Sequence, residues 1–233
     1  MTDAANPDPA VIARAITMRG PSGPVYGPVD LDITAGGVTV LVCPPGSGRT
    51  ALLMTLAGRM RPGSGTLSVF GRSKVRDVFT GAALAAIEDL DGVSESVTVG
   101  DALTEQMRWD ARWYKLIGRA DEAALAKICG PVFGDLPLPP LHEYVEELSE
   151  LDRMLLRVAL ANTARPPLLV VGDIEQVTHD ESREHLVARL VELGAEQTVV
   201  TASANGVTDH PVHQIPVENT SRVSHAGQQK GGA

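Results

Sequence analysis

The stretch Cys43-Pro44-Pro45-Gly46-Ser47-Gly48-Arg49-Thr50 lies between the apolar run Val-Thr-Val-Leu-Val at residues 38–42 and a helix-forming run at residues 51–57. A strand, a glycine-rich turn and a helix, with a cation and a hydroxyl group where the turn ends, form the arrangement that cradles phosphate groups. Gly46 and Gly48 allow successive backbone N–H groups to point inward, and the helix N-terminus adds positive potential. We therefore expect the eight residues to bind phosphate, with the hydroxyl group of Thr50 offered to Mg²⁺.

Two positions depart from the G-x-x-x-x-G-K-S/T pattern of such loops. Cys43 stands in place of the first glycine, and Arg49 stands in place of the lysine. Arginine keeps the positive charge, but its guanidinium group is a wide planar fork, whereas lysine is a compact point charge. Pro44 and Pro45 lack N–H groups, but they precede the part of the loop that forms most of the cradle. From this stretch alone, an ordinary strand-to-helix turn remains the alternative.

The composition excludes several classes of protein. The chain has 233 residues, of which 43% are hydrophobic and 21% are charged, and its net charge is −9. This acidity argues against a nucleic-acid surface, and two cysteines cannot form a disulfide framework. Apolar runs long enough to cross a bilayer are absent, and the first ten residues lack a signal-peptide pattern. We therefore expect a cytoplasmic chain that reaches the inner face of the cell membrane only through a partner.

The sequence around the phosphate loop resembles the nucleotide-binding subunits of ABC transporters. Residues 29–33 alternate apolar and acidic side chains, residues 35–37 read A-G-G, and residues 51–58 read A-L-L-M-T-L-A-G. These are followed by R-P-G-S-G-T-L at residues 61–67 and V-F-G at residues 69–71. The resemblance implies an α/β fold of the ABC-type P-loop NTPase class, with a mixed sheet, helices on both faces, an inserted helical lobe and an antiparallel β edge. It also implies ATP and Mg²⁺ as cofactors, a permease as partner and a homo- or heterodimer.

The same resemblance predicts the division of the chain. Residues 1–10 are expected to be a disordered lead, and residues 11–217 the nucleotide-binding domain. Within that domain, residues 11–18 read as an edge strand, and the helical lobe spans about residues 98–162. Residues 218–233 are polar, end in glycines and alanine, and are expected to be a disordered tail.

The family places two acids after an apolar strand, an aspartate for magnesium and a glutamate that activates water. Residues 168–173 read Leu-Leu-Val-Val-Gly-Asp. One register puts Gly172 at the first acid and Asp173 at the second, whereas the other makes Asp173 the metal-side acid and puts Ile174 at the base. In either register one acid is missing, and Glu175 lies too far along the chain to be a good substitute by position.

A second acidic candidate is Glu88, which follows a small-residue apolar run at residues 82–87. The family has a glutamine at the end of this strand, where it helps to hold magnesium. A plain acidic strand terminus is the equally weighted alternative for Glu88.

Two further family segments are altered. Leu148 and Ser149 match the family's L-S-G-G-Q, which contacts the γ-phosphate bound to the opposite subunit, but residues 150–152 read Glu-Leu-Asp. Carboxylates there would repel a phosphate, and Ser149 with Asp152 also reads as a capping box, so we favour capping for Asp152. Ser149 fits both roles. Residues 203–205, Ser-Ala-Asn, stand where the family has a histidine that contacts the γ-phosphate.

Residues 98–117 predict a long helix with an unusual aromatic content. Thr98 is expected to be its N-cap, with Asp101 completing a capping box. Leu103, Met107, Ala111 and Tyr114 form one stripe, which we expect in the lobe, and Trp109, Trp113 and Leu116 form another. The second stripe is either an exposed surface for a permease or part of the core.

The sequence thus supports two functions. The first is the ATP-binding, energy-coupling subunit of a transporter, with the loop at residues 43–50 on the phosphates and Thr50 with Asp173 on magnesium. The second is an ABC-like nucleotide-sensing or structural module with little hydrolysis, because several expected catalytic residues are replaced. A third, weaker alternative is another P-loop enzyme such as a kinase.

Overall fold

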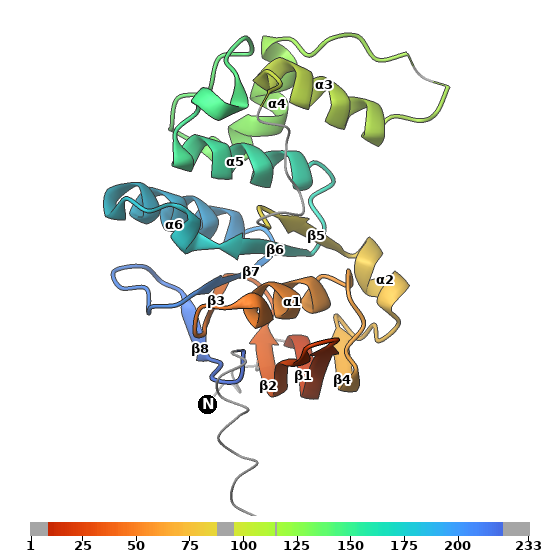
Figure 1. The fold of residues 1–233 in the computed structure, drawn as a ribbon. Helices are drawn as coiled ribbons and strands as arrows, with labels where there is room; N and C mark the ends of the chain where they lie inside the picture. The colour runs from red at the N-terminus through yellow and green to blue at the C-terminus, as the bar shows by residue number, and fades with distance from the viewer. Residues whose placement is uncertain (1–8, 88–95, 115, 221–233) are drawn as a thin grey trace, which may run out of the picture.

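The computed structural model describes residues 9–87, 96–114 and 116–220. Its centre is a five-stranded parallel sheet of strand order β5-β6-β7-β3-β8 (Figure 1). These strands are β3 (Val38–Val42), β5 (Ala82–Ala85), β6 (Leu168–Asp173), β7 (Thr198–Ser203) and β8 (His213–Pro216). We expected a mixed sheet, and the described strands instead separate into this parallel sheet and a smaller antiparallel one.

The parallel sheet is buried on both faces, which explains why its strands are continuous apolar runs. Successive residues point to opposite faces of a strand. In β6, Leu169 and Val171 pack into one apolar cluster with the helical lobe and α6 (Asp180–Gly194). Leu168 and Val170 pack into a second cluster with α1 (Ser47–Leu56) and the antiparallel sheet. The sheet therefore separates two cores.

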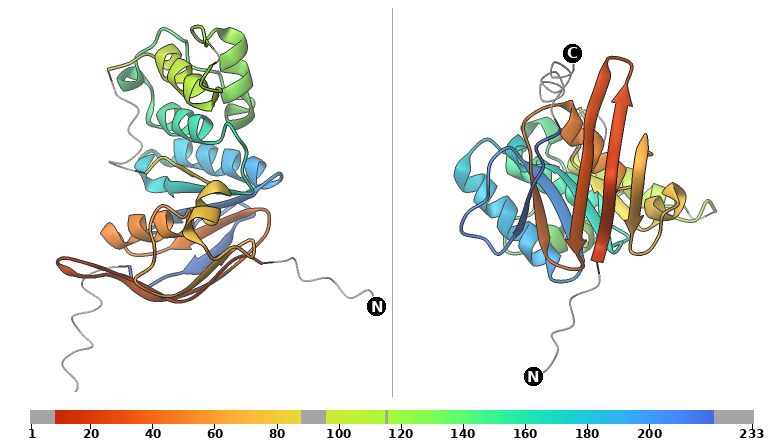
Figure 2. Two further views of the ribbon diagram at one scale, coloured as in Figure 1. Left: turned by 90° about the vertical axis from the view of Figure 1, so that its right-hand side faces the viewer. Right: turned by 90° about the horizontal axis from the view of Figure 1, so that it is seen from below.

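The antiparallel sheet has the strand order β2-β1-β4 and lies at the end of the molecule opposite the lobe (Figure 2). It consists of β1 (Pro9–Gly20), β2 (Gly23–Thr34) and β4 (Ser64–Val69). The prediction of an edge strand at residues 11–18 is wrong, because β1 pairs with a strand on each side. Residues 9 and 10, which we assigned to the lead, belong to β1, and Ala10 is fully buried.

Helices cover the two faces of the parallel sheet. The helix α1 (Ser47–Leu56) lies between the two sheets, and α6 (Asp180–Gly194) packs on the opposite face against β7 and β3. A short helix, α2 (Val75–Thr80), which the sequence did not predict, precedes β5. Single 3₁₀ turns occur at Val145–Glu147 and Ile174–Gln176.

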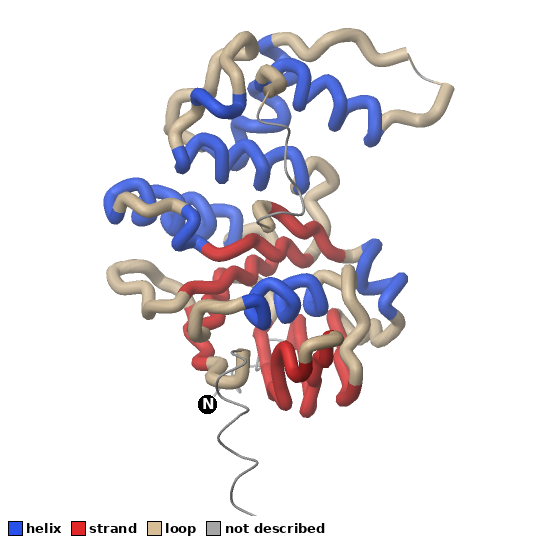
Figure 3. The backbone as a smooth tube through the Cα atoms, viewed as in Figure 1, coloured by secondary structure: helices blue, strands red, loops and turns tan. Residues whose placement is uncertain are grey.

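The helical lobe is formed by α3 (Val99–Asp110), α4 (Glu122–Phe133) and α5 (Glu150–Ala161), and it is the helical end of the molecule in Figure 3. The predicted cap is present, since the side chain of Thr98 accepts a hydrogen bond from the amide of Asp101. The predicted helix is too long, because Ala111 is extended and α3 ends at Asp110.

The sequence predicts a short helix at residues 121–128 and, from four prolines, a loop at residues 130–140. The helix α4 is longer than this prediction, because it contains Pro131 and continues to Phe133. The buried side chain of Arg189 explains this, because it donates hydrogen bonds to the carbonyl groups of Pro131 and Val132 in the last turn of α4. Carbonyl groups at a helix C-terminus lack partners within the helix, so an external donor stabilises that turn.

The segment after β8 packs against the body of the protein. The amide of Gly27 donates a hydrogen bond to the carbonyl oxygen of Asn219 at 2.9 Å, and Thr220 is buried. Residues 219 and 220 therefore contact the folded body, and the prediction of a disordered tail from residue 218 starts at too early a residue. In the part of the chain that the structure describes, no helix is both long and apolar enough to cross a bilayer.

Candidate phosphate-binding site

The candidate site lies where the carboxyl ends of the parallel strands meet. The phosphate loop follows β3, Asp173 ends β6 and Ser203 ends β7. Ligands of open α/β sheets bind at this edge. A cavity of about 260 Å³ opens there, lined by Gly46, Arg49, Thr50, Leu53, Ile87, Gly172, Asp173 and Gln176. The predicted loop and the predicted magnesium acid therefore share one cavity.

The backbone of the loop depends on glycine at two positions. Gly46 has a φ of 151°, a conformation that favours glycine, and α1 begins at the next residue. The first amide groups of a helix lack acceptors within it and suit an anion, but in this loop the amide of Arg49 already donates to the carbonyl oxygen of Gly46 at 3.2 Å. Gly48 is required for packing, because a Cβ there would lie 2.1 Å from the carbonyl oxygen of Thr220 and 2.3 Å from that of Val25.

The first three residues of the loop face the protein interior to different degrees. Cys43 is buried, its thiol donates to the carbonyl oxygen of Leu41 at 3.5 Å, and burial raises its pKa to about 11. It therefore remains a neutral thiol near neutral pH. The carbonyl oxygen of Pro44 accepts a hydrogen bond from the hydroxyl group of Thr220 at 3.5 Å, and Pro45 is exposed.

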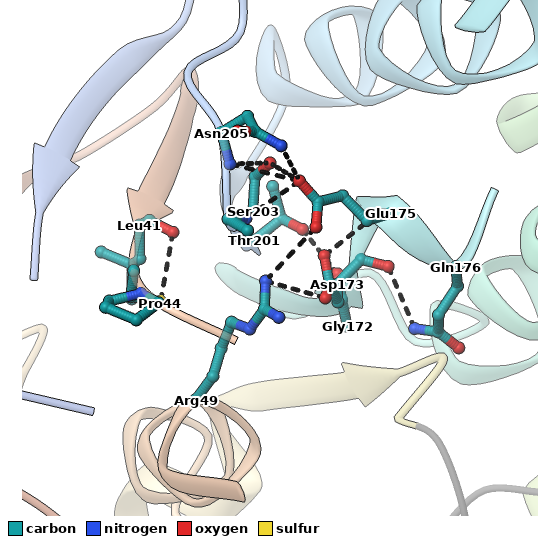
Figure 4. A network of polar contacts seen from close by, with 12 residues as sticks. Leu41, Pro44, Arg49, Gly172, Asp173, Glu175, Gln176, Thr201, Ser203 and Asn205 are labelled. Carbon is teal, nitrogen blue, oxygen red and sulfur yellow. Dashed lines mark hydrogen bonds and ion pairs between the residues drawn. The ribbon is translucent and has the colours of Figure 1, made fainter. Parts of the chain in front are cut away.

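Arg49 points across the cavity to the end of β6 (Figure 4). Its Nη1 atom lies 2.8 Å from Oδ2 of Asp173 and 3.9 Å from Oε2 of Glu175. The shorter contact is an ion pair whose angle is not that of a hydrogen bond. The Arg49 side chain is only 10% exposed, so solvent screens this pair less than a surface pair.

A bulge in β6 favours one of the two registers for Asp173. Val170 pairs with Val200, but Asp173 pairs with Ala202, so β6 contains one residue more than β7 over this interval. Asp173 thus occupies the place that residue 172 would have in a regular strand, which favours the metal-side acid. A Cβ on Gly172 would lie 1.9 Å from the carbonyl oxygen of Ala86, so a larger residue does not fit there.

Glu175 lies beside the cavity, 3.9 Å from Arg49, although it is not among the residues that line the cavity and its position in the sequence argued against a part in the site. The 3₁₀ turn after β6 brings it back, with Oδ1 of Asp173 accepting from the amide of Glu175 at 3.0 Å. Its Oε1 atom accepts hydrogen bonds from residues 203–205: Ser203 Oγ, the amides of Ala204 and Asn205, and Asn205 Nδ2, at 2.9–3.2 Å. The residues that replace the family's histidine therefore hold this carboxylate.

Gln176 and Arg157 were not singled out from the sequence, and they connect the lobe to the cavity. Gln176 donates to the carbonyl oxygen of Ala86 at 2.8 Å and accepts a hydrogen bond from Arg157 of α5 at 3.2 Å. Arg157 also donates to the carbonyl oxygen of Ile87 at 2.8 Å. Glu88, the other predicted acid, lies outside the described residues.

Ser149 is not among the residues that line the cavity. It caps α5, since it accepts from the amide of Asp152 at 3.0 Å and donates to Oδ2 of Asp152 at 2.7 Å, which confirms the capping prediction. Glu150 accepts two hydrogen bonds from Thr178, one from its amide and one from its hydroxyl group, and the backbone bond is the main cause that lowers the pKa of Glu150.

The second aromatic stripe is exposed. Trp109 is 77% exposed, Trp113 95% and Leu116 100%, so of the two alternatives for this stripe the structure supports the exposed surface and not the core. Leu103 of the first stripe is buried, but Tyr114 is 62% exposed, because it lies beyond the end of α3.

Two oxygen ligands that suit magnesium line the cavity together. Mg²⁺ prefers hard oxygen ligands and retains several water molecules, and the hydroxyl group of Thr50 and the carboxylate of Asp173 line the same cavity. Within residues 9–87, 96–114 and 116–220, there is no cluster of three or more His, Cys, Asp or Glu residues that would hold a metal by themselves.

Comparison with known proteins gives consistent similarities. Residues 26–229 match the family model described as ABC transporter. The chain is 31% identical over 105 residues, 45% of each chain, to the cytochrome c biogenesis ATP-binding export protein CcmA of Cupriavidus pinatubonensis. It is 26% identical over 218 residues to the probable multidrug ABC transporter ATP-binding protein YbhF of Escherichia coli, with 91% of this chain and 36% of that one covered. It thus spans less than half the length of either relative.

The fold has close counterparts among solved structures. A putative ABC transporter ATP-binding protein from Pyrococcus furiosus superposes with a TM-score of 0.67 at 18% identity, covering 89% of this chain and 96% of that one. At this level of identity the likeness concerns the fold, including the parallel sheet, the antiparallel sheet and the helices.

Proposed function

This chain belongs to the ABC transporter family as one of its ATP-binding domains, and we propose that it binds ATP with Mg²⁺ and couples binding to a membrane permease. The observation that carries the proposal is the cavity of about 260 Å³, which the phosphate loop, Arg49 and Asp173 line together. Pockets for whole small molecules usually measure about 300–1,000 Å³. This cavity suits the phosphate tail of a nucleotide whose remainder lies outside it.

The phosphate loop and Asp173 each have a distinct part in this proposal. Amide groups of Gly46 to Gly48 donate to the phosphates, and the N-terminus of α1 adds positive potential. Arg49 neutralises phosphate charge once it leaves Asp173. Thr50 and Asp173 hold Mg²⁺, which, when bound, would withdraw charge from the phosphates.

We further propose that hydrolysis is slow unless a partner completes the site. Ile174 stands where the family has its water-activating glutamate, and Glu175 is fixed by four donors from residues 203–205. Loss of a positioned base or of one phosphate contact commonly costs about 100-fold in rate. A subunit with several such replacements would bind ATP and depend on a competent partner in a homo- or heterodimer.

The proposed permease contact is the exposed group Trp109, Trp113, Tyr114 and Leu116, which we name the aromatic tip. Exposed apolar groups of this kind mark partner surfaces. A neighbouring cavity of about 490 Å³, lined in part by Met107, Ile117, Ile128 and Pro131, extends this surface over α3 and α4. Through this contact the chain would lie on the inner face of the membrane.

A second function, a nucleotide-sensing or structural module, is favoured by two observations. The cation of the phosphate loop is already paired with Asp173. The acids that replace part of the family's L-S-G-G-Q are engaged as well, Asp152 in capping and Glu150 in contacts to Thr178. Such a domain would bind nucleotide and turn it over slowly or not at all.

Radiolabelled ATP with Mg²⁺ distinguishes the two functions. Steady phosphate release that Arg49→Ala abolishes would favour the energy-coupling subunit, whereas binding without release would favour the module. The absence of ATP binding under any condition would contradict both.

The permease proposal has its own test, co-purification with a multi-span membrane protein encoded by an adjacent gene. The double variant Trp109→Ala/Trp113→Ala should lose the partner. The control is Phe79→Ala, which removes a 51% exposed aromatic residue from α2 outside the lobe. Equal recovery of the partner with both variants would contradict docking at the aromatic tip.

A further inference from the structure

Two carboxylates compete with phosphate for the single cation of the loop. Arg49 Nη1 is 2.8 Å from Asp173 Oδ2 and 3.9 Å from Glu175 Oε2, so one guanidinium group faces two negative charges. The Arg49 side chain is 10% exposed and both acids are 25% exposed, so bulk water weakens these interactions only in part. An entering phosphate must therefore replace a carboxylate on Arg49, and it meets the repulsion of both acids.

Glu175 cannot easily swing away from this arrangement. Its Oε1 atom accepts four hydrogen bonds from Ser203, Ala204 and Asn205, at 2.9–3.2 Å. Its amide is bound to Oδ1 of Asp173 at 3.0 Å, so the two acids are held in one turn. The loop after β7 thus fixes the second carboxylate beside Arg49.

We propose that Asp173 and Glu175 make this site selective for metal-bound nucleotide and exclude the metal-free form. Neutralisation of these carboxylates by a divalent cation removes both the competition for Arg49 and the repulsion of the phosphates. Asp173 has the larger part because it is 2.8 Å from Arg49, and Glu175 has the smaller part at 3.9 Å. The inference rests on the proposed binding of ATP at this loop, and it assigns to Glu175 a role in specificity.

The test is calorimetric titration of ATP into the full-length chain, once with Mg²⁺ and once with a chelator and no metal. The wild-type chain should bind ATP with Mg²⁺ and bind metal-free ATP about tenfold or more weakly, within the usual range of coupling between two ligands. Asp173→Asn should strengthen binding of metal-free ATP by about tenfold and weaken binding in Mg²⁺, because it removes a competitor and a metal ligand at once.

Glu175→Gln should also strengthen binding of metal-free ATP, but less than Asp173→Asn does. Because it keeps the size of the side chain, it still tests the proposal if Asp173→Asn fails to fold. The matched control is Asp135→Asn, which removes one negative charge from an exposed position on the lobe and should change neither affinity. Thermal melting of each variant reports whether it is folded.

The outcomes separate this inference from the proposed function. A wild-type chain that binds ATP equally with and without Mg²⁺, or acid variants that bind metal-free ATP no better, would overturn the selectivity while ATP binding stands. A wild-type chain that binds ATP in neither condition would overturn the proposed function and the inference with it.

Discussion

Gly48 lies where two backbone segments approach the phosphate loop. A Cβ at this position would lie 2.1 Å from the carbonyl oxygen of Thr220 and 2.3 Å from that of Val25. Both obstacles are backbone atoms, so they cannot rotate away as a side chain does. We expect Gly48→Ala to lower the free energy of unfolding by about 1–3 kcal/mol, a typical cost of overpacking, as measured by urea denaturation.

The control for this prediction is Gly118→Ala. An added Cβ at Gly118 meets no atom within 4 Å, and its backbone is not in the left-handed region. This variant should unfold within about 0.5 kcal/mol of the wild-type chain, as surface changes usually do. Equal losses for the two variants would show that the contact with Thr220 and Val25 is not what restricts residue 48.

At the level of single residues, the sequence predicted the loop better than the acids. The pattern from Gly46 to Thr50 identifies a backbone conformation, and local pattern suffices for that. The place of Asp173 depends on a bulge in the pairing of β6 with β7, and that pairing joins segments about 30 residues apart. Glu175 enters the site through a tight turn and through donors on another strand, which counting along the chain could not reveal.

Among the elements, α4 depends on a residue from a distant helix. Arg189 of α6 is 7% exposed, and its Nε atom donates to the carbonyl oxygen of Val132 at 2.8 Å. Arg189→Ala would leave buried carbonyl oxygens in the last turn without this donor. We expect a loss of about 1–3 kcal/mol in the free energy of unfolding, the usual cost of an unsatisfied buried group, measured by urea denaturation.

Arg119→Ala is the matched control for Arg189→Ala. The Arg119 side chain is 88% exposed, and it forms a loose 3.8 Å ion pair with Asp101. Exposed pairs contribute about 0–1 kcal/mol, so this variant should remain close to the wild-type chain. If both variants lower the free energy of unfolding equally, the buried contact between Arg189 and α4 does not contribute more than an exposed ion pair.

The start of α5 gives a second prediction at this scale. Ser149 is the N-cap, and its exchange of hydrogen bonds with Asp152 satisfies one amide of the first turn. Ser149→Ala should reduce the free energy of unfolding by about 0.5–2 kcal/mol, whereas Ser149→Asn, which retains a capping oxygen, should restore most of it. Thermal melting of the two variants measures this, and a full loss with asparagine would contradict a capping role.

The extents of the lobe helices were the weakest part of the sequence prediction. The side-chain pattern of residues 98–117 is helical to its end, but the aromatic residues after Asp110 find no partner surface within the described chain. The longer α4 depends on Arg189, which is 58 residues away from Pro131. Helix ends set by such distant contacts leave no local signal, whereas the caps at Thr98 and Ser149 are local and were predicted.

For the whole molecule, the alternation of sheets and helices was predictable because both faces of the parallel sheet are buried. The runs at residues 38–42 and 168–173 are apolar in every or nearly every position, as strands with two covered faces require. The separation of the antiparallel strands into their own sheet was harder to predict from the sequence, because β1 pairs with β4 across about 50 residues. Its central position depends on that long-range pairing.

The two cores that flank the sheet should make the protein sensitive to alkali. Burial raises the pKa of Cys43 from 9.0 to about 11 and that of Cys129 from 9.0 to about 12, and it also raises the pKa of Tyr26. A raised folded pKa adds stability that is complete below the unfolded value and is lost as the pH rises through the folded one. The free energy of unfolding should therefore fall above pH 9, by about 1.4 kcal/mol per pH unit for each thiol. Urea denaturation from pH 7 to 10.5 under reducing conditions measures this slope. Cys129→Ala should reduce the slope, and a slope equal to that of the wild-type chain would contradict the assignment.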